Sequence, residues 1–119
     1  MQVITPLIQF QQQLRIFHWQ TDSYAKHKAF GKAYEELDGL IDTFVEIFMG
    51  KFGRSKPTVT FQINLKPLNN EEIVEQVLTS FEAYLMDMSE ELNSQTDLLN
   101  IRDSILAEVN HLRYRLSLS

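Results

Sequence analysis

The segment KFGRSKPTVTFQINLKPLNN, residues 51–70, decides how this chain folds. Between Pro57 and Pro67 it alternates apolar and polar residues with a period of two, as an extended chain with one buried face would. The apolar positions of this alternation are Val59, Phe61, Ile63 and Leu65. So long a connection is unusual inside a compact domain, so we expect it to serve the topology of the fold.

Amphipathic helical patterns occupy the rest of the chain, because apolar residues recur there every three or four positions. Asp22 or Ser23 is a suitable N-cap for the second pattern, and Asn69 or Asn70 is one for the third. The four predicted helices cover residues of about 3–20, 25–50, 71–92 and 96–117.

The length of the connection predicts the order of these helices. A helix over residues 25–50 is ~39 Å long at 1.5 Å per residue, whereas the extended segment 51–70 can reach ~66 Å. The connection can therefore cross the whole bundle and set the helix at 71–92 parallel to the helix at 25–50. The other connections are short and imply antiparallel neighbours. We therefore predict an all-α fold, a ferritin-like four-helix bundle with a long crossover between its second and third helices.

Composition limits the class of protein. The 119 residues suit one domain, covering residues 1–119, and 44% apolar with 23% charged residues is a globular balance. The net charge of −5 disfavours strong nucleic-acid binding. No apolar run approaches the ~20 residues of a membrane span, and the start of the chain lacks a secretory signal pattern. The absence of cysteine excludes thiolate chemistry and fits a reducing compartment, so we expect a cytoplasmic protein.

One constellation of residues suggests chemistry. His18-Trp19 is followed by His27, and then by Asp42 and Glu46, which are four residues apart and share a helix face. Imidazole and carboxylate together form a ligand set that suits iron, zinc or manganese. The alternative interpretation of the two carboxylates is an ordinary solvated acidic face.

Helical periodicity indicates where these carboxylates point. Measured from Leu37 in the core stripe, Asp42 lies at about 140° and Glu46 at about 180°, on the outward side of the helix. Gly31 and Gly39 lie on the same side, although glycine inside a helix costs about 0.5–1 kcal/mol relative to alanine. We interpret these glycines as positions where another backbone approaches closely, which suggests a partner subunit. The helix at 3–20 also has large apolar residues off its main stripe, at Ile8, Ile16 and Trp19.

The two histidines can meet only if the chain turns between them. His18 and His27 are nine residues apart and would lie on opposite sides of one unbroken helix. A turn around residues 21–23 lets both face one location. A histidine beside a core stripe is often a hydrogen-bonded structural residue, so a structural role remains the alternative to a ligand role.

Residues 10–50 resemble the Dps family, the mini-ferritins, in their ferroxidase motif. The similarity rests on His18-Trp19, on the interval from His27 to Asp42 to Glu46, and on the flanking runs IFHW (residues 16–19) and YEEL (residues 34–37). As a whole the chain is most similar to short Dps-related proteins of phages and large viruses. The interval between the histidines is shorter here than in that family, and the crossover stands in place of the family's small helix.

The resemblance implies a function. His18 and His27 of one subunit, with Asp42 and Glu46 of its two-fold mate, would bind Fe(II) in a mono-iron or di-iron centre. Peroxide or oxygen would then oxidise the iron, and Trp19 would absorb stray oxidising equivalents. It also implies a homo-oligomer, with a dimer formed through the helices at 3–20 and 25–50 and a twelve-subunit shell for iron storage.

Two alternatives stay open. The chain could be a ferritin-like structural or interaction module of a virus particle, acting in the host cytoplasm without ferroxidase activity. Glu108 and His111 also have the Glu-x-x-His spacing of di-iron bundles, although no second copy of that motif accompanies them. We favour a surface histidine at position 111.

Overall fold

The computed structural model describes residues 2–54 and 60–119, in which all regular structure is helical. The helices are α1 (Ile4–Gln20), α2 (Tyr24–Phe52), α3 (Glu71–Glu91) and α4 (Thr96–Ser117). Each end lies within two residues of its predicted position.

The helix ends follow from local chemistry. The Ser23 side chain accepts a hydrogen bond from the backbone N–H of Lys26, and Asn70 accepts one from Ile73, so both helices begin at a polar cap. At the other end of α2, Gly53 has a φ of 92° and donates its N–H to the carbonyl of Met49. This conformation strains any residue with a side chain, which explains why the helix stops at a glycine.

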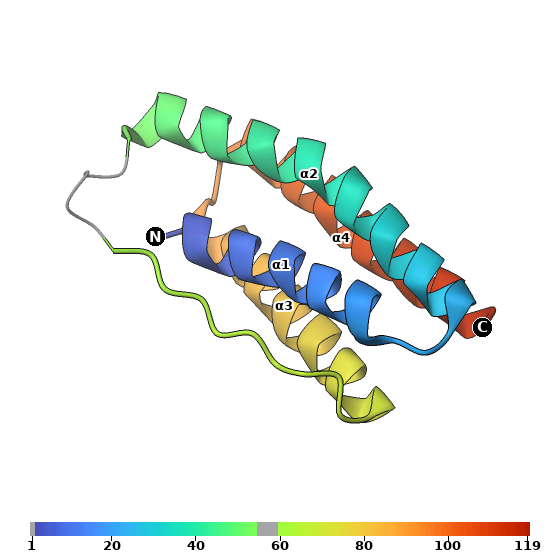
Figure 1. Cartoon of the computed structure of the whole chain (residues 1–119). Coiled ribbons are helices and arrows are strands. Elements are labelled where there is room, and N and C mark those ends of the chain that lie inside the picture. The colour runs from blue at the N-terminus through green and yellow to red at the C-terminus, as the bar shows by residue number, and fades with distance from the viewer. Residues whose placement is uncertain (1, 55–59) are drawn as a thin grey trace.

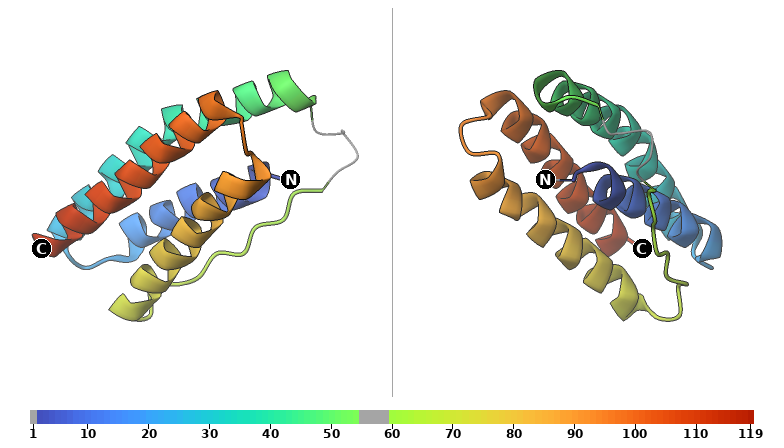
Figure 2. Two further views of the ribbon diagram at one scale, coloured as in Figure 1. Left: turned by 180° about the vertical axis from the view of Figure 1, so that it is seen from behind. Right: turned by 90° about the vertical axis from the view of Figure 1, so that its left-hand side faces the viewer.

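The four helices form a bundle in which each contacts two others. The contacting pairs are α1 with α2, α1 with α3, α2 with α4, and α3 with α4. Figure 1 shows α2 and α3 starting at the same end of the bundle and running in the same direction. The views in Figure 2 show the same arrangement from behind and from the side.

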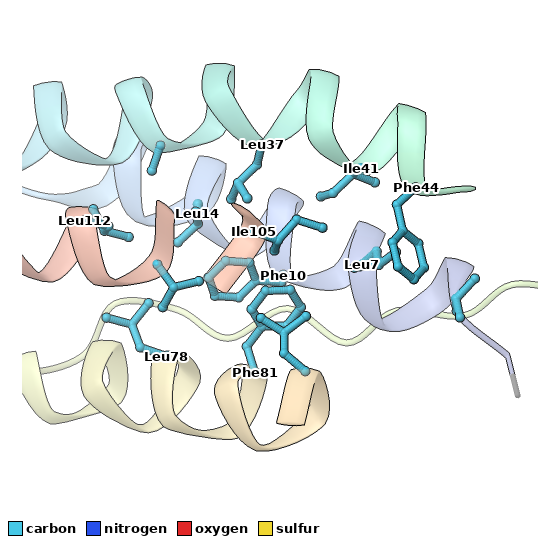
Figure 3. Close-up of a cluster of buried hydrophobic side chains, with 14 of the residues drawn as sticks. Leu7, Phe10, Leu14, Leu37, Ile41, Phe44, Leu78, Phe81, Ile105 and Leu112 are labelled. Atoms are coloured by element: carbon cyan, nitrogen blue, oxygen red, sulfur yellow. The ribbon is translucent and has the colours of Figure 1, made fainter. Parts of the chain in front are cut away.

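The core is an apolar interior to which all four helices contribute. The rings of Phe10 and Phe81 stack with centroids 3.8 Å apart and planes 4° from parallel, which joins α1 to α3. Leu7, Leu14, Leu37, Phe44, Leu78, Leu85, Ile105 and Leu112 are among the buried side chains, and Figure 3 shows most of them. Burial of this kind supplies most of the stability of helices in a bundle.

The described part of the connection between α2 and α3 lies along α1 (Figures 1 and 2). Three glutamine side chains of α1 bind its backbone, and we call these Gln9, Gln13 and Gln20 the glutamine ladder. They accept hydrogen bonds from the N–H groups of Asn64, Lys66 and Leu68 at 3.0, 2.7 and 2.7 Å. Gln13 also donates to the Lys66 carbonyl at 2.8 Å, so its amide is bonded in both directions.

The alternation in this segment does not produce the buried face that the sequence suggested. Ile63 is half-buried, but Phe61 and Leu65 remain 43% and 40% exposed. The reason is that the segment rests on α1 by its backbone instead of filling a groove with its side chains. Val59, the first apolar position of the pattern, lies outside the described residues.

Candidate functional site

The two predicted histidines meet at the turn between α1 and α2. The His18 imidazole donates from Nδ1 to the backbone carbonyl of His27 at 2.7 Å, and His27 donates from Nδ1 to the carbonyl of His18 at 2.8 Å. Their rings stack with centroids 3.8 Å apart and planes 16° from parallel. The prediction that a turn around residues 21–23 brings them together is confirmed.

These hydrogen bonds fix the form of each imidazole. A carbonyl oxygen can only accept, so Nδ1 of both rings must carry a proton. In the neutral ring, Nε2 then carries the lone pair. A histidine whose Nδ1–H is anchored on a backbone carbonyl is held in the tautomer and orientation that metal-binding histidines commonly have.

The histidine pair belongs to a longer stack of flat groups. The Tyr24 ring stacks with the His27 ring, with centroids 6.2 Å apart. The His18 ring also lies against the backbone of α2 at Gly31, where a β-carbon would be 2.9 Å from Cε1 and 3.0 Å from Nδ1 of that ring.

This contact corrects our interpretation of the glycines. The group that needs the space at Gly31 is the imidazole of His18 in the same chain, not the backbone of a partner. Gly39 differs, because no atom of the described residues lies within 4 Å of the place where its β-carbon would be. Of the two glycines, only Gly39 leaves room on the outward face of α2.

Beside His18 lies a small hollow of about 140 Å³, lined by Arg15, His18, Gly31, Tyr34 and Glu35. The Arg15 guanidinium lies 4.2 Å from the centroid of the Tyr34 ring and 5.3 Å from that of Trp19. A cation held over aromatic faces in this way is stabilised by the ring electrons. Trp19 is 63% exposed, so its outer face is open to solvent.

Arg15 and Tyr34 did not emerge from the sequence pattern as part of the site. The signal that could have found them is spacing, because Arg15 is four residues before Trp19 and three before His18 on α1. Tyr34 stands three residues after Gly31 on α2, so it follows the same face.

Asp42 and Glu46 lie far from the histidines within one chain. Both are exposed, as their outward placement predicted. Asp42 is fifteen residues beyond His27 along α2, which corresponds to about 22 Å at 1.5 Å per residue. Across residues 2–54 and 60–119, no three or more histidine, aspartate or glutamate side chains gather closely enough to hold a metal ion. The four predicted ligands therefore do not form a complete site within a single protomer.

The outward face of α2 carries charges of both signs. Lys32 and Glu36 form an ion pair at 2.9 Å, one helical turn apart. Their hydrogen bond and mutual attraction lower the pKa of Glu36 and raise the pKa of Lys32. This pair occupies the stretch between the histidines and the exposed carboxylates, so the face is not uniformly acidic.

The Glu108 and His111 motif has a different partner from a metal. Arg115 donates to Glu108 at 2.8 Å, and a second guanidinium nitrogen lies 3.1 Å from Nδ1 of His111. A guanidinium keeps its positive charge at all ordinary pH values. Arg115 therefore occupies the position that a cation would need, and His111 is an exposed surface residue as favoured from the sequence.

Comparisons with known proteins give a family but no activity. Residues 18–116 match the family model described as a family of unknown function, DUF5856. Over 80 residues the chain is 29% identical to an uncharacterized 14.6 kDa protein in the mobD-ri intergenic region of Enterobacteria phage T4. That match covers 67% of this chain and 62% of the phage protein. No solved structure matches the chain significantly.

In the part of the chain that the structure describes, no helix is long and apolar enough to cross a membrane.

Proposed function

The chain belongs to the family of unknown function DUF5856, and we propose that it binds Fe(II) at a site shared between two copies of itself and oxidises it. The observation that carries the proposal is the anchored histidine pair. Both rings of His18 and His27 have Nδ1 bonded to a backbone carbonyl, which leaves Nε2 for a ligand bond. Two imidazole nitrogens and two carboxylates suit iron, and they also suit zinc or manganese.

The distance within one chain supports a shared site. An antiparallel, two-fold pairing of α2 with a second α2, centred near Glu35, would set His27 within about one helical turn of Asp42 and Glu46 of the second protomer. The same pairing would set Gly39, which has open space around it, opposite the Gly31 position that carries the His18 ring. A residue as small as Gly39 in that position favours close approach of the second α2 helix.

The order of the helices is consistent with a ferritin-like topology. The chain has two helix pairs, α1 with α2 and α3 with α4, and α2 and α3 run in the same direction. In the proposed function, iron bound beside the histidines passes electrons to oxygen or peroxide. The exposed Trp19, next to Arg15, is suited to absorb stray oxidising equivalents. Assembly into a closed shell, within a host cytoplasm, would allow the ferric product to be stored.

A second candidate function rests on the same histidines. Their reciprocal hydrogen bonds already satisfy both Nδ1 atoms and tie the end of α1 to the start of α2. That is a complete structural role. In this second candidate, the bundle is a structural or interaction module, related to phage proteins, and has no ferroxidase activity.

Anaerobic titration with Fe(II), followed by addition of peroxide, separates the two candidates. We expect one saturable set of iron sites in the wild type and ferric absorbance after the oxidant is added. Asp42→Ala/Glu46→Ala should abolish both signals. The matched control is Asp87→Ala/Glu91→Ala, which removes an exposed Asp/Glu pair of the same spacing from α3 and should change neither. Equal iron binding by the wild type and the α2 variant would overturn the proposal.

Complementation tests whether the site is shared. The Asp42→Ala/Glu46→Ala protein retains its histidines, and a His27→Gln protein retains its carboxylates. Neither should bind iron alone. A mixed dimer contains one complete site, so mixing the two proteins should restore part of the binding. Sizing by sedimentation gives the assembly, and a strictly monomeric protein would contradict a shared site.

A further inference from the structure

Residues 60–66 form an extended segment on the outside of the bundle. Figures 1 and 2 show it beyond α1, with no helix on its outer side. The segment carries no charge before Lys66, and Phe61 and Leu65 are 43% and 40% exposed. An exposed, uncharged and extended segment of this kind can pair with another chain, and proteins usually block such edges with charge, proline or a covering element.

The glutamine ladder shows which backbone groups are already in use. It binds the N–H groups of Asn64, Lys66 and Leu68, which are two residues apart. A repeat of two is that of a β-strand, whose successive N–H groups point to opposite edges. The N–H groups of Phe61, Ile63 and Leu65 must therefore point away from α1. Within the described residues, none of these three N–H groups makes a hydrogen bond.

We propose that this outer edge pairs with the same edge of a second copy, as two antiparallel strands whose two-fold axis passes through Ile63. In this register Ile63 faces its own copy, and Phe61 faces Leu65 of the other strand. Because the N–H and carbonyl groups of these odd-numbered residues point outward, all three facing pairs are hydrogen-bonded pairs. The even-numbered residues keep their bonds to α1.

The segment is complementary to itself in this register. On one face, Phe61, Ile63 and Leu65 form a continuous apolar row across both strands. On the other face, Gln62 lies opposite Asn64, so an amide meets an amide. No like charges oppose each other, although the chain as a whole has a net charge of −5. A second copy therefore satisfies both the backbone and the side chains of this edge.

The pairing should be weak, because seven residues on each side bury well under the ~1,200 Å² of a standard specific interface. We expect an association step, additional to the pairing through α2, that grows as the protein concentration rises from about 10 µM to about 1 mM. This surface lies on the crossover and does not use the histidines or the carboxylates of α2. The pairing can therefore be tested independently of iron binding.

Disulfide trapping tests the register, because the chain has no cysteine of its own. Facing residues of a hydrogen-bonded pair have Cα atoms about 5.5 Å apart, which is within the range of a disulfide. Ile63→Cys should therefore cross-link to itself under mild oxidation. Gln62→Cys is the matched control, since it lies diagonal to its own copy, beyond the ~7 Å limit for a disulfide. An equimolar mixture of Phe61→Cys and Leu65→Cys should give a mixed dimer, whereas each alone should not.

Removal of one backbone donor tests the same pairing without cross-linking. Ile63→Pro removes two symmetry-related hydrogen bonds, and at ~1 kcal/mol each this weakens the dimer about thirtyfold. Far-UV circular dichroism and thermal unfolding establish that the variant is folded. Equal trapping of Ile63→Cys and Gln62→Cys would overturn the proposal. So would a wild type whose assembly does not grow between about 10 µM and about 1 mM, including the case in which the edge binds a strand from another protein.

Discussion

Replacing Gly31 by alanine tests the packing of the histidine stack. The new β-carbon would lie 2.9 Å from Cε1 and 3.0 Å from Nδ1 of His18, closer than a β-carbon normally approaches other heavy atoms. The His18 ring cannot move aside freely, because its Nδ1 is bonded to the His27 carbonyl and its face is stacked on the His27 ring. Gly31→Ala therefore has two opposing effects on stability, which are a steric cost at His18 and the usual gain from alanine in a helix.

The magnitudes predict the sign of the effect. Overpacking a fixed side chain costs about 1–3 kcal/mol, whereas glycine to alanine in a helix gains about 0.5–1 kcal/mol. We expect Gly31→Ala to lower the free energy of unfolding by about 1–2 kcal/mol, taking the upper part of the range because the ring is fixed. At roughly 4 °C per kcal/mol, the melting temperature should fall by about 4–8 °C.

Gly39→Ala is the matched control within a single chain, since the substitution and the helix are the same and no atom of the described residues lies within 4 Å of the new methyl group. It should raise the free energy of unfolding of the separate chain by about 0.5–1 kcal/mol. Urea unfolding measures both variants. A double-mutant cycle with His18→Ala should remove the penalty at position 31, with a coupling of about 2 kcal/mol. If Gly31→Ala stabilises the protein as much as Gly39→Ala does, the reasoning about the His18 ring is refuted.

Two further predictions concern hydrogen bonds between distant segments. Gln13→Glu sets a carboxylate against the Lys66 carbonyl and should lower the free energy of unfolding by about 2 kcal/mol. Gln9→Glu should be nearly neutral in the same urea experiment, because the bond of Gln9 to the described part of the crossover is one that it accepts. Arg113 donates to Glu75 and lowers the pKa of that carboxyl below its ordinary 4.5. A lowered pKa contributes stability above pH 4.5 that is lost as the pH falls through the folded value, so wild type should lose more stability than Glu75→Gln between about pH 5 and pH 3. The pair is exposed, so the difference should stay under about 1 kcal/mol, and an identical acid dependence of the two proteins would contradict it.

The sequence predicted the elements of the fold because helical periodicity and polar caps are local signals. Ser23 and Asn70 cap their helices as expected, and the turn between α1 and α2 brings the histidines into contact. The outward placement of Asp42 and Glu46 also followed from periodicity alone. Their convergence with the histidines depends on a second protomer and stays a prediction.

The contacts that the sequence did not reveal are made by side chains without a recognisable pattern. They join residues that are far apart along the chain. A glutamine on a helix has no pattern that marks it as a partner for backbone 53 residues away, yet Gln13 has that role. The alternation from Phe61 to Leu65 predicted burial because it resembled a half-buried strand, whereas the segment is held by its backbone. Arg102 is a similar case, 7% exposed and bonded to the Leu85 carbonyl. From the sequence alone, such an arginine is expected to lie at the surface.

The glutamine ladder also has a consequence for the order in which the molecule forms. The helical hairpins close over short turns, whereas the ladder joins groups 48 to 55 residues apart. Loop closure over so long a separation has an entropic cost that must be met before those bonds can form. Docking of the crossover onto α1 should therefore be the last step of folding, and the amide protons of Asn64, Lys66 and Leu68 should exchange with solvent sooner than those of the buried helices.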